Sequence, residues 1–344
     1  TQNWTSTSSY PNTKLKPDRT KSWEVGLDAR ILNDISLNLT YYRSNTYNQT
    51  FYADLSLSSG YSNIPIQSGN IMNEGIEMAL GYNKQWKDFS FNTNYTLTWN
   101  KNRVKRLADG VYNYATGQSI QMPELSPLTY GHTDARLILR VGGSMGDVYG
   151  QRLLKRDLNG YILNEEGVGL TMENKETFLV SILPKMIMGW SLGFGYKGVN
   201  LGMTFTGRFG GIVISETQSV LDAAGVSKVS ADVRDAGGVQ INQGKVSAQT
   251  YYQAIQGTAA YYTYSATNVR FGELSLSYTL PKKWFDNKVG MTVGLVGKNL
   301  WMIYCKAPFD PELTTSAASN FYQGFDAYML PSTRNFGFNI KFQF

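Results

Sequence analysis

Period-two alternation of apolar and polar residues dominates this 344-residue chain. The last segment, RNFGFNIKFQF, has an apolar residue at every even position from Phe336 to Phe344 and a polar residue or glycine at every odd one. Successive side chains of a β-strand point to opposite faces, so such a run predicts a two-faced strand. Nine runs of this kind predict nine strands: SWEVGLDARI from Ser22, DISLNLTY from Asp34, GIEMALGY (75–82), FSFNTNYTLTW (89–99), WSLGFGYK from Trp190, GVNLGMTFT from Gly198, ELSLSYTLP from Glu273, KVGMTVGL from Lys288 and the last segment.

The connections between these strands alternate between short and long. The short ones have hairpin length and lie at 33–34, 83–88, 197–198 and 281–288. The long ones all fall at the other end of the strands, near 46–71, 101–186, 211–265 and 300–327. Outer-membrane barrels have this asymmetry, with short periplasmic turns and long outer loops, whereas a soluble sandwich has no reason to collect its long loops at one end.

The chemistry of the polar faces also favours a barrel. Amide, hydroxyl and glycine residues fill the polar face of the last strand and of the strand after Asp34, and Lys and Glu are few. Exposed strands of soluble proteins usually carry more Lys and Glu, whereas a hydrated lumen suits this composition. We therefore predict an all-β fold, a transmembrane antiparallel β-barrel in the outer membrane, with its apolar face toward lipid.

Nine strands do not close a bacterial barrel, because such barrels have an even strand number and an open edge is costly in lipid. Residues 1–344 are therefore expected to be the C-terminal part of a larger barrel. The sequence has neither a signal-peptide pattern nor an apolar window long enough for a membrane helix, which fits that expectation. A passive porin-like channel and a soluble β-rich adhesin or binding module remain as alternatives.

Composition argues against several other function classes. The single Cys305 and single His132 do not suffice for an intrachain disulfide or a zinc site of the usual Cys/His type. No phosphate-binding or catalytic motif is present, so no enzymatic activity is expected. The net charge of +6 is spread along the chain, which argues against nucleic-acid binding. The densest basic run, KNRVKR at 101–106, either contacts lipopolysaccharide phosphates or is a solvated loop.

Several segments resemble SusC/RagA-type TonB-dependent transporters. SGNIMNEGIEMALGYN (68–83) is similar to their N-x-G-x-E strand start, and ATNVRFGELSLSYTLPKKW (266–284) resembles their R-F/L-x-x-L-x-L-x-Y-x-L-P segment. VGLVGKNLW (293–301) is similar to their G-x-N-L motif, FDPEL (309–313) to their F-D-P-E, and the tail to their closing strand. The resemblance covers roughly 20–344; the plug domain, the TonB box and the first strands have no counterpart.

The resemblance implies a barrel of about 22 strands in a Bacteroidetes-type outer membrane. It implies import of oligosaccharides or peptides under a SusD-like lipoprotein lid, with energy supplied by TonB through the N-terminal part that this chain lacks. The terminal aromatic Phe344 resembles the signal by which the barrel-assembly machinery recognises its clients.

The outer loops supply the candidate site residues. Aromatic faces stack on sugar rings and carboxylates accept hydroxyl hydrogen bonds, so substrate contact is predicted for Trp301, Tyr304, Asp310, Glu312 and Tyr322. For Asp310 and Glu312 the alternative is that the F-D-P-E motif shapes its loop. Arg208, at the outer end of a strand, is expected to face the lumen.

Two further loop segments carry weaker patterns. KRDLNGYILNEE (155–166) places Asp157, Asn159 and Glu166 at calcium-loop positions, but Lys155 stands at position one and cannot coordinate, so a simple β-turn is the alternative and no cofactor is otherwise expected. SAQTYYQAIQG (247–257) has helical spacing and predicts a short helix, whose aromatic residues meet a lid protein or substrate or pack within the loop.

Overall fold

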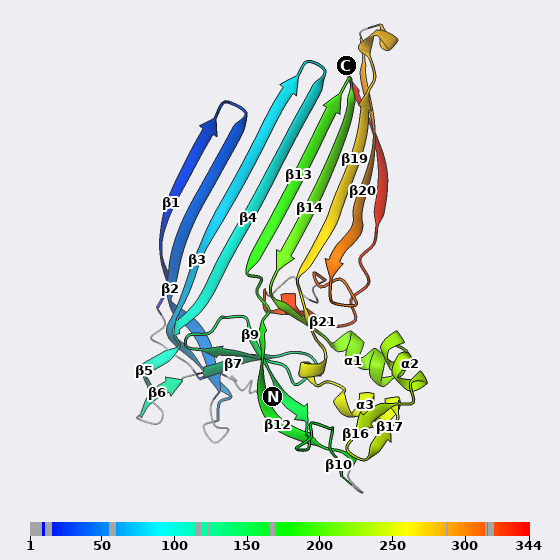
Figure 1. The fold of residues 1–344 in the computed structure, drawn as a ribbon. Helices are drawn as coiled ribbons and strands as arrows, with labels where there is room; N and C mark the ends of the chain where they lie inside the picture. The colour runs from blue at the N-terminus through cyan, green and yellow to red at the C-terminus, as the bar shows by residue number, and fades with distance from the viewer. Residues whose placement is uncertain are drawn as a thin grey trace, which may run out of the picture.

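The computed structural model describes the chain except residues 1–8, 11–15, 55–59, 114–117, 123, 166–168, 287, 314 and 316–319. The described chain forms two parts, a long curved sheet and a layer of short strands and helices at one end of it (Figure 1). We call these the barrel sheet and the loop layer. Within the described residues, no helix has the length and apolar character needed to cross a membrane.

The barrel sheet contains nine antiparallel strands whose order in the sheet is their order along the chain. All nine predicted strands are confirmed. They are β1 (Arg19–Ile31), β2 (Ile35–Asp54), β3 (Asn63–Trp86), β4 (Phe89–Arg106), β13 (Met186–Tyr196), β14 (Val199–Phe209), β19 (Asn268–Thr279), β20 (Gly290–Cys305) and β22 (Asn335–Gln343). The 3-10 helix η3 (Lys282–Phe285) lies in the connection between β19 and β20.

The register gathers the apolar residues on one face of this sheet. In one row, Leu27, Leu39, Met78, Leu97 and Met188 lie directly opposite one another in five consecutive strands. Many large side chains of this face are exposed instead of packing against the rest of the chain; examples are Val25, Trp190, Leu276, Leu295 and Phe338. A continuous exposed apolar belt of this extent is matched by lipid and not by water.

The opposite face is polar. The next row reads Asp28, Asn38, Ala79, Thr96 and Gly189 across the same five strands. Small, hydroxyl and amide side chains of this kind line the water-filled interior of a barrel. The alternation in the sequence therefore corresponds to a real difference between a lipid face and a lumen face.

Glycine on the lumen face makes room for a neighbouring aromatic ring. A Cβ at Gly75 would lie 2.7 Å from the ring carbon Cζ of Tyr42 and 2.4 Å from the carbonyl oxygen of Trp99. The Tyr42 ring thus lies over the Gly75 backbone, and its hydroxyl donates to Asn100 Oδ1 at 3.0 Å. This contact gives the glycine of the N-x-G-x-E segment a physical role.

Aromatic side chains gather toward both ends of the lipid face. Toward the loop layer, Trp190, Phe205 and Phe271 pack in series with ring centroids 5.8 and 4.8 Å apart. Toward the short turns, Phe91 and Phe194 pack at 5.0 Å. Two such bands are typical of the interfacial girdles of an outer-membrane barrel.

The strands continue beyond the loop boundaries predicted from alternation. Most of 46–71 is paired strand, because β2 runs to Asp54 and β3 begins at Asn63, and residues 101–106 and 300–305 belong to β4 and β20. Beyond the membrane both faces of a strand meet water or protein, so side-chain chemistry no longer alternates while backbone pairing persists. The predicted loop at 46–71 is therefore wrong in its extent.

The loop layer is built from short elements in the remaining long connections. Its strands are β5 (Ala108–Asn113), β6 (Gln118–Met122), β7 (Glu124–Thr129), β8 (Arg136–Arg140), β9 (Asp147–Leu154), β10 (Asn164–Glu165), β11 (Gly169–Leu170), β12 (Met172–Ser181), β15 (Ile212–Ser215), β16 (Val239–Ile241), β17 (Gly244–Val246), β18 (Thr263–Ser265) and β21 (Phe325–Asp326). Its helices are α1 (Glu216–Ala223), α2 (Lys228–Asp235), α3 (Ala248–Ile255) and the 3-10 helices η2 (Ala259–Tyr261) and η4 (Asn320–Gly324).

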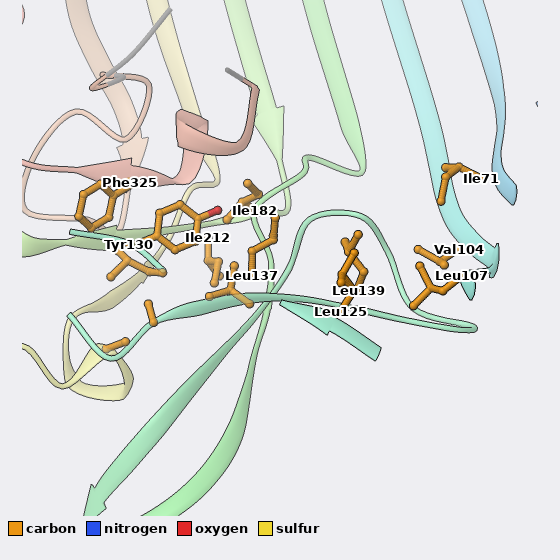
Figure 2. Close-up of a cluster of buried hydrophobic side chains, with 14 residues drawn as sticks. Ile71, Val104, Leu107, Leu125, Tyr130, Leu137, Leu139, Ile182, Ile212 and Phe325 are labelled. Carbon is orange, nitrogen blue, oxygen red and sulfur yellow. The ribbon is translucent and has the colours of Figure 1, made fainter. Parts of the chain in front are cut away.

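Two hydrophobic clusters hold the loop layer together. The larger one joins Ile71 of β3 and Val104 near the end of β4 to Leu137, Ile212 and Phe325 of the loop layer (Figure 2). The second packs α3 against β9, β16 and η2. Residues distant in the sequence therefore form two buried clusters beside the barrel sheet, which hold the loops in a folded arrangement.

Candidate functional site at the loop end of the barrel wall

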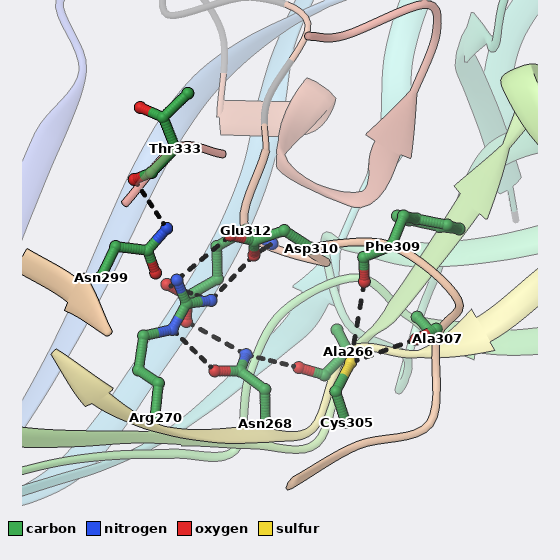
Figure 3. Close-up of polar contacts among 10 residues, drawn as sticks. All are labelled: Ala266, Asn268, Arg270, Asn299, Cys305, Ala307, Phe309, Asp310, Glu312 and Thr333. Atoms are coloured by element: carbon green, nitrogen blue, oxygen red, sulfur yellow. Dashed lines mark hydrogen bonds and ion pairs between the residues drawn. The ribbon is translucent and has the colours of Figure 1, made fainter. Parts of the chain in front are cut away.

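An arginine of the barrel sheet binds the segment that follows β20. Arg270 on β19 donates from Nη1 and Nη2 to the two carboxylate oxygens of Asp310, at 3.2 and 2.8 Å, and its Nη2 lies 3.2 Å from Glu312 Oε2 (Figure 3). Asn268 completes the group, since its side chain accepts from Arg270 Nε at 3.3 Å and donates to Glu312 Oε1 at 3.1 Å. We call these four residues the carboxylate clasp.

The carboxylate clasp is largely shielded from water. The side chains of Arg270 and Asp310 are 14% and 9% exposed. Burial raises the pKa of the Asp310 carboxyl, but hydrogen bonds from Arg270 and from the Glu312 amide outweigh it and hold the pKa below its ordinary value. The bidentate pair is therefore charged at neutral pH and fixes the F-D-P-E segment on β19.

Asp310 and Glu312 are thus already engaged by a protein cation. Their contacts match the alternative in which the motif shapes its loop, and substrate contact for these two carboxylates is not supported by their placement. Sequence reasoning missed Arg270 and Asn268 as partners. Both lie inside the segment ATNVRFGELSLSYTLPKKW. The available signal was that this segment carries a cation, Arg270, and that the F-D-P-E motif carries two carboxylates.

The placement of Trp301 and Tyr304 gives no support to their predicted contact with substrate. Trp301 lies opposite Phe271, and Tyr304 lies opposite Val269, on the lipid face of the sheet. A bulge between Lys298 and Trp301, where Asn299 has φ of 53°, shifts the phase of β20 relative to β19. Trp301 is 61% exposed and extends the aromatic band at the membrane boundary.

Tyr322 belongs to the larger hydrophobic cluster. Its ring packs edge-on against Tyr130, with centroids 6.0 Å apart. Packing within the loop layer also accounts for the predicted helix at 247–257, which forms as α3 with Tyr252 and Ile255 buried. These aromatic residues support the layer and do not present a free stacking surface.

Arg208 lies at the loop end of β14, opposite Ile187 and Asn268 on the lumen face. Its guanidinium donates from Nη2 to the carbonyl oxygen of Ile182 at 3.1 Å. Arg208 therefore joins the barrel sheet to the segment that returns from the loop layer. The cationic side chain reaches from the lumen wall toward the same region as the carboxylate clasp.

The calcium pattern at 155–166 forms a turn where the structure describes it. Asp157 Oδ1 accepts from the amides of Asn159 and Tyr161, both at 2.9 Å, and Gly160 has the left-handed φ of 85° that a turn favours. Glu166 lies outside the described residues. Elsewhere, the described ranges bring no three His, Cys, Asp or Glu side chains together in a group that could hold a metal ion.

A sheet with an exposed apolar belt, a polar opposite face, aromatic bands and folded loops at one end is the wall of an outer-membrane β-barrel. Residues 2–169 match the family model described as TonB dependent receptor-like, beta-barrel. TonB-dependent receptors P3 and P26 of Formosa agariphila are 24% and 23% identical over 97% and 96% of this chain. The chain is therefore similar to TonB-dependent receptors along almost its whole length, and its barrel wall places it in the outer membrane.

The fold is also that of solved transporters. The structure titled as the RagAB peptide importer in the open-open state aligns with a TM-score of 0.69 at 18% identity over 97% of this chain, and the closed-closed state aligns with 0.64 at 17% over 94%. This chain spans 35% of the length of each of these relatives and structures. The predicted resemblance and fold class are therefore confirmed.

Proposed function

We propose that this chain is part of the wall of an importer that takes up nutrients across the outer membrane with energy supplied through TonB. The observation that carries the proposal is the family match at 2–169, on a sheet that has a lipid face and a polar lumen face. The proposal takes the chain as one segment of a longer receptor, whose other parts contact TonB. The chain itself then provides a wall and loops and no catalysis.

Peptides are the substrates that the comparisons favour, because the similar solved structures are titled as peptide importers. Oligosaccharides remain the second candidate, from the resemblance to SusC-type transporters. A SusD-like lipoprotein would cover the loop end, where the folded loop layer offers a fixed surface. Lipopolysaccharide would meet Lys101 and Arg103, which the register places on the same face as the lipid-facing Trp99.

The test compares energised and passive uptake by the full-length receptor in cells. Labelled peptides and labelled oligosaccharides are supplied with and without TonB, and with and without a protonophore. We expect uptake of one class to fall at least about tenfold when either TonB or the proton-motive force is removed. Uptake that persists at the same rate without both would identify a passive channel and overturn the proposal.

Co-purification tests the lid. The receptor solubilised in mild detergent should carry a surface lipoprotein through size-exclusion chromatography. Its absence from membranes in which TonB-dependent uptake has been measured would remove the lid from the proposal and leave the import function standing.

A further inference from the structure

The three α-helices of the loop layer border an open cavity that none of the functions above uses. It has a volume of about 440 Å³ and is lined by the end of α1, by α2 and by the start of α3, which lie together at one side of the layer (Figure 1). A cavity of this size accommodates a small organic molecule. Two opposite charges, on Asp222 and Arg234, line it.

Asp222 is a buried carboxylate that lacks a cationic partner. The residue is 4% exposed, and its Oδ1 accepts from Gln218 Nε2 at 2.7 Å and from the Ser227 hydroxyl. Neither of these bonds reaches Oδ2, and no Lys or Arg in the part of the chain that the structure describes forms an ion pair with Asp222. A buried anion is costly unless a cation compensates it, so the cavity is suited to a positive group.

The other side of the cavity offers donors for an anion. Among the described residues, Arg234 is bound only through Nε, which lies 3.2 Å from the exposed Asp235 carboxylate, so its two terminal amino groups remain for a ligand. Ser247 caps α3 by accepting from the Thr250 amide at 3.1 Å. The amides of Ala248 and Gln249, in the first turn of α3, have no acceptor among the described residues.

We propose that this cavity binds a zwitterion, either a free amino acid or a dipeptide. The ammonium group lies at Asp222, and the carboxylate lies at Arg234 and the first turn of α3, where the helix dipole favours negative charge. A simple cation leaves the donors unmatched, and a simple anion meets the charge of Asp222. A molecule with both groups satisfies both sides of the cavity at once.

The inference rests on the proposed function for its biological meaning, because a zwitterion site in the outer loops belongs to an importer of peptides. Its measurement is independent of uptake. Isothermal titration calorimetry of the full-length receptor in detergent uses dialanine as the probe, with N-acetyl-dialanine and dialanine amide as matched ligands that each lack one charge. We expect dialanine to bind and both blocked forms to bind at least about tenfold more weakly.

Three variants locate the binding. Asp222→Asn keeps the shape and the acceptor of the side chain, Arg234→Gln removes an exposed charge that lines the cavity, and Lys228→Gln removes an exposed charge of α2 that lies outside the cavity and pairs with Asp232. The first two should each weaken dialanine binding about tenfold or more, while Lys228→Gln leaves it unchanged.

Two results would overturn the zwitterion site. One is dialanine binding no tighter than its blocked forms, which includes no binding at all; the other is an equal loss in Arg234→Gln and Lys228→Gln. Heat-modifiable mobility on gels confirms that each variant is folded. A receptor that does not bind dialanine but shows TonB-dependent uptake would refute this site alone, whereas dialanine binding without energised uptake would refute the proposed import.

Discussion

The barrel sheet and the loop layer use the same apolar residues in opposite ways. In the loop layer Leu137 and Ile214 are fully buried, with no exposed surface. On the last strand of the barrel sheet Phe336 and Phe338 are 79% and 75% exposed. One region removes apolar surface from water by packing it against protein, and the other does so only when lipid surrounds it. Hydrophobicity alone does not separate these cases; the chemistry of the opposite face does.

Truncating one apolar residue in each region tests this contrast most strongly. Ile214→Ala leaves a closed cavity, so it should cost about 4 kcal/mol, the sum of a transfer and a cavity contribution. Leu276→Ala on the lipid face should cost only about 1–2 kcal/mol, because lipid chains fill the space. Hydrogen exchange at the amides of β15 and β19 in the full-length receptor measures the two local stabilities. Equal costs would contradict the assignment of the lipid face.

Placing a charge on each face of one strand tests the lipid face against the lumen face. Here the substitution on the lipid face should be the more costly one. Leu192→Arg puts a guanidinium in the middle of the lipid face and should cost about 3 kcal/mol. Ser191→Arg, one residue earlier and opposite Asn94 and Thr204 on the lumen face, should change the folding free energy by less than about 1 kcal/mol. Urea titration of folding into lipid vesicles gives both values. If Ser191→Arg lowered the free energy of unfolding more than Leu192→Arg, the assignment of the lipid and lumen faces would have to be exchanged.

Breaking either of two ion pairs made by β19 should have a smaller effect on stability. Arg270 of β19 pairs with Asp310 after β20, and Glu273 of β19 pairs with Lys298 of β20. Asp310→Asn leaves Arg270 with one carboxylate instead of two and should lower the local stability of residues 306–313 by about 2 kcal/mol. Glu273→Gln, which breaks an exposed pair with Lys298, should cost less than about 1 kcal/mol. Hydrogen exchange of the two segments compares them. If Glu273→Gln lowered local stability as much as Asp310→Asn, burial of the carboxylate clasp would add nothing to the strength of its ion pair.

The barrel sheet could be predicted from the sequence because its strands lie between two different media. Lipid and lumen select opposite side chains at alternate positions, and this selection leaves a readable pattern in all nine strands. The pattern stops where the strands leave the membrane, so the extension of β2 to Asp54 had no comparable signal. Backbone pairing there depends on the partner strand and not on the residue sequence of one strand.

The site was less predictable because its contacts join distant segments. Asp310 and Glu312 were picked out from their own loop, but their partner Arg270 lies about forty residues earlier in the chain. Trp301 follows the alternation of β20, because Leu295, Gly297 and Trp301 are all odd positions on the lipid face. On β19 the register shift between Phe271 and Glu273 does reverse the phase, so Leu274 and Phe271 both face lipid, and alternation read from that strand alone does not reveal it.

The smallest expected effect is the pH dependence of local stability at two carboxyls, Asp310 of the carboxylate clasp and Asp147 of the loop layer. Their pKa values are shifted in opposite directions. The pKa of Asp310 is lowered in the folded chain, so its contribution is present above the unfolded value near 3.9 and is lost as pH falls through the folded pKa. Burial raises the pKa of Asp147, the first residue of β9 after the turn at 144–146, against a lowering hydrogen bond from the Ser144 amide. Its ionisation therefore opposes folding, and the turn should gain stability as pH falls from neutral through that raised pKa.

Hydrogen exchange across pH 7 to 3 distinguishes the two responses. After correction for the intrinsic exchange rate, protection at residues 144–147 should rise on acidification while protection at 306–313 stays constant and then falls only below about pH 4. Asp147→Asn should abolish the rise and leave the fall, and Asp310→Asn should do the reverse. A parallel fall in both segments would show that Asp147 is stabilised as an anion, because its hydrogen bond from Ser144 would then outweigh its burial.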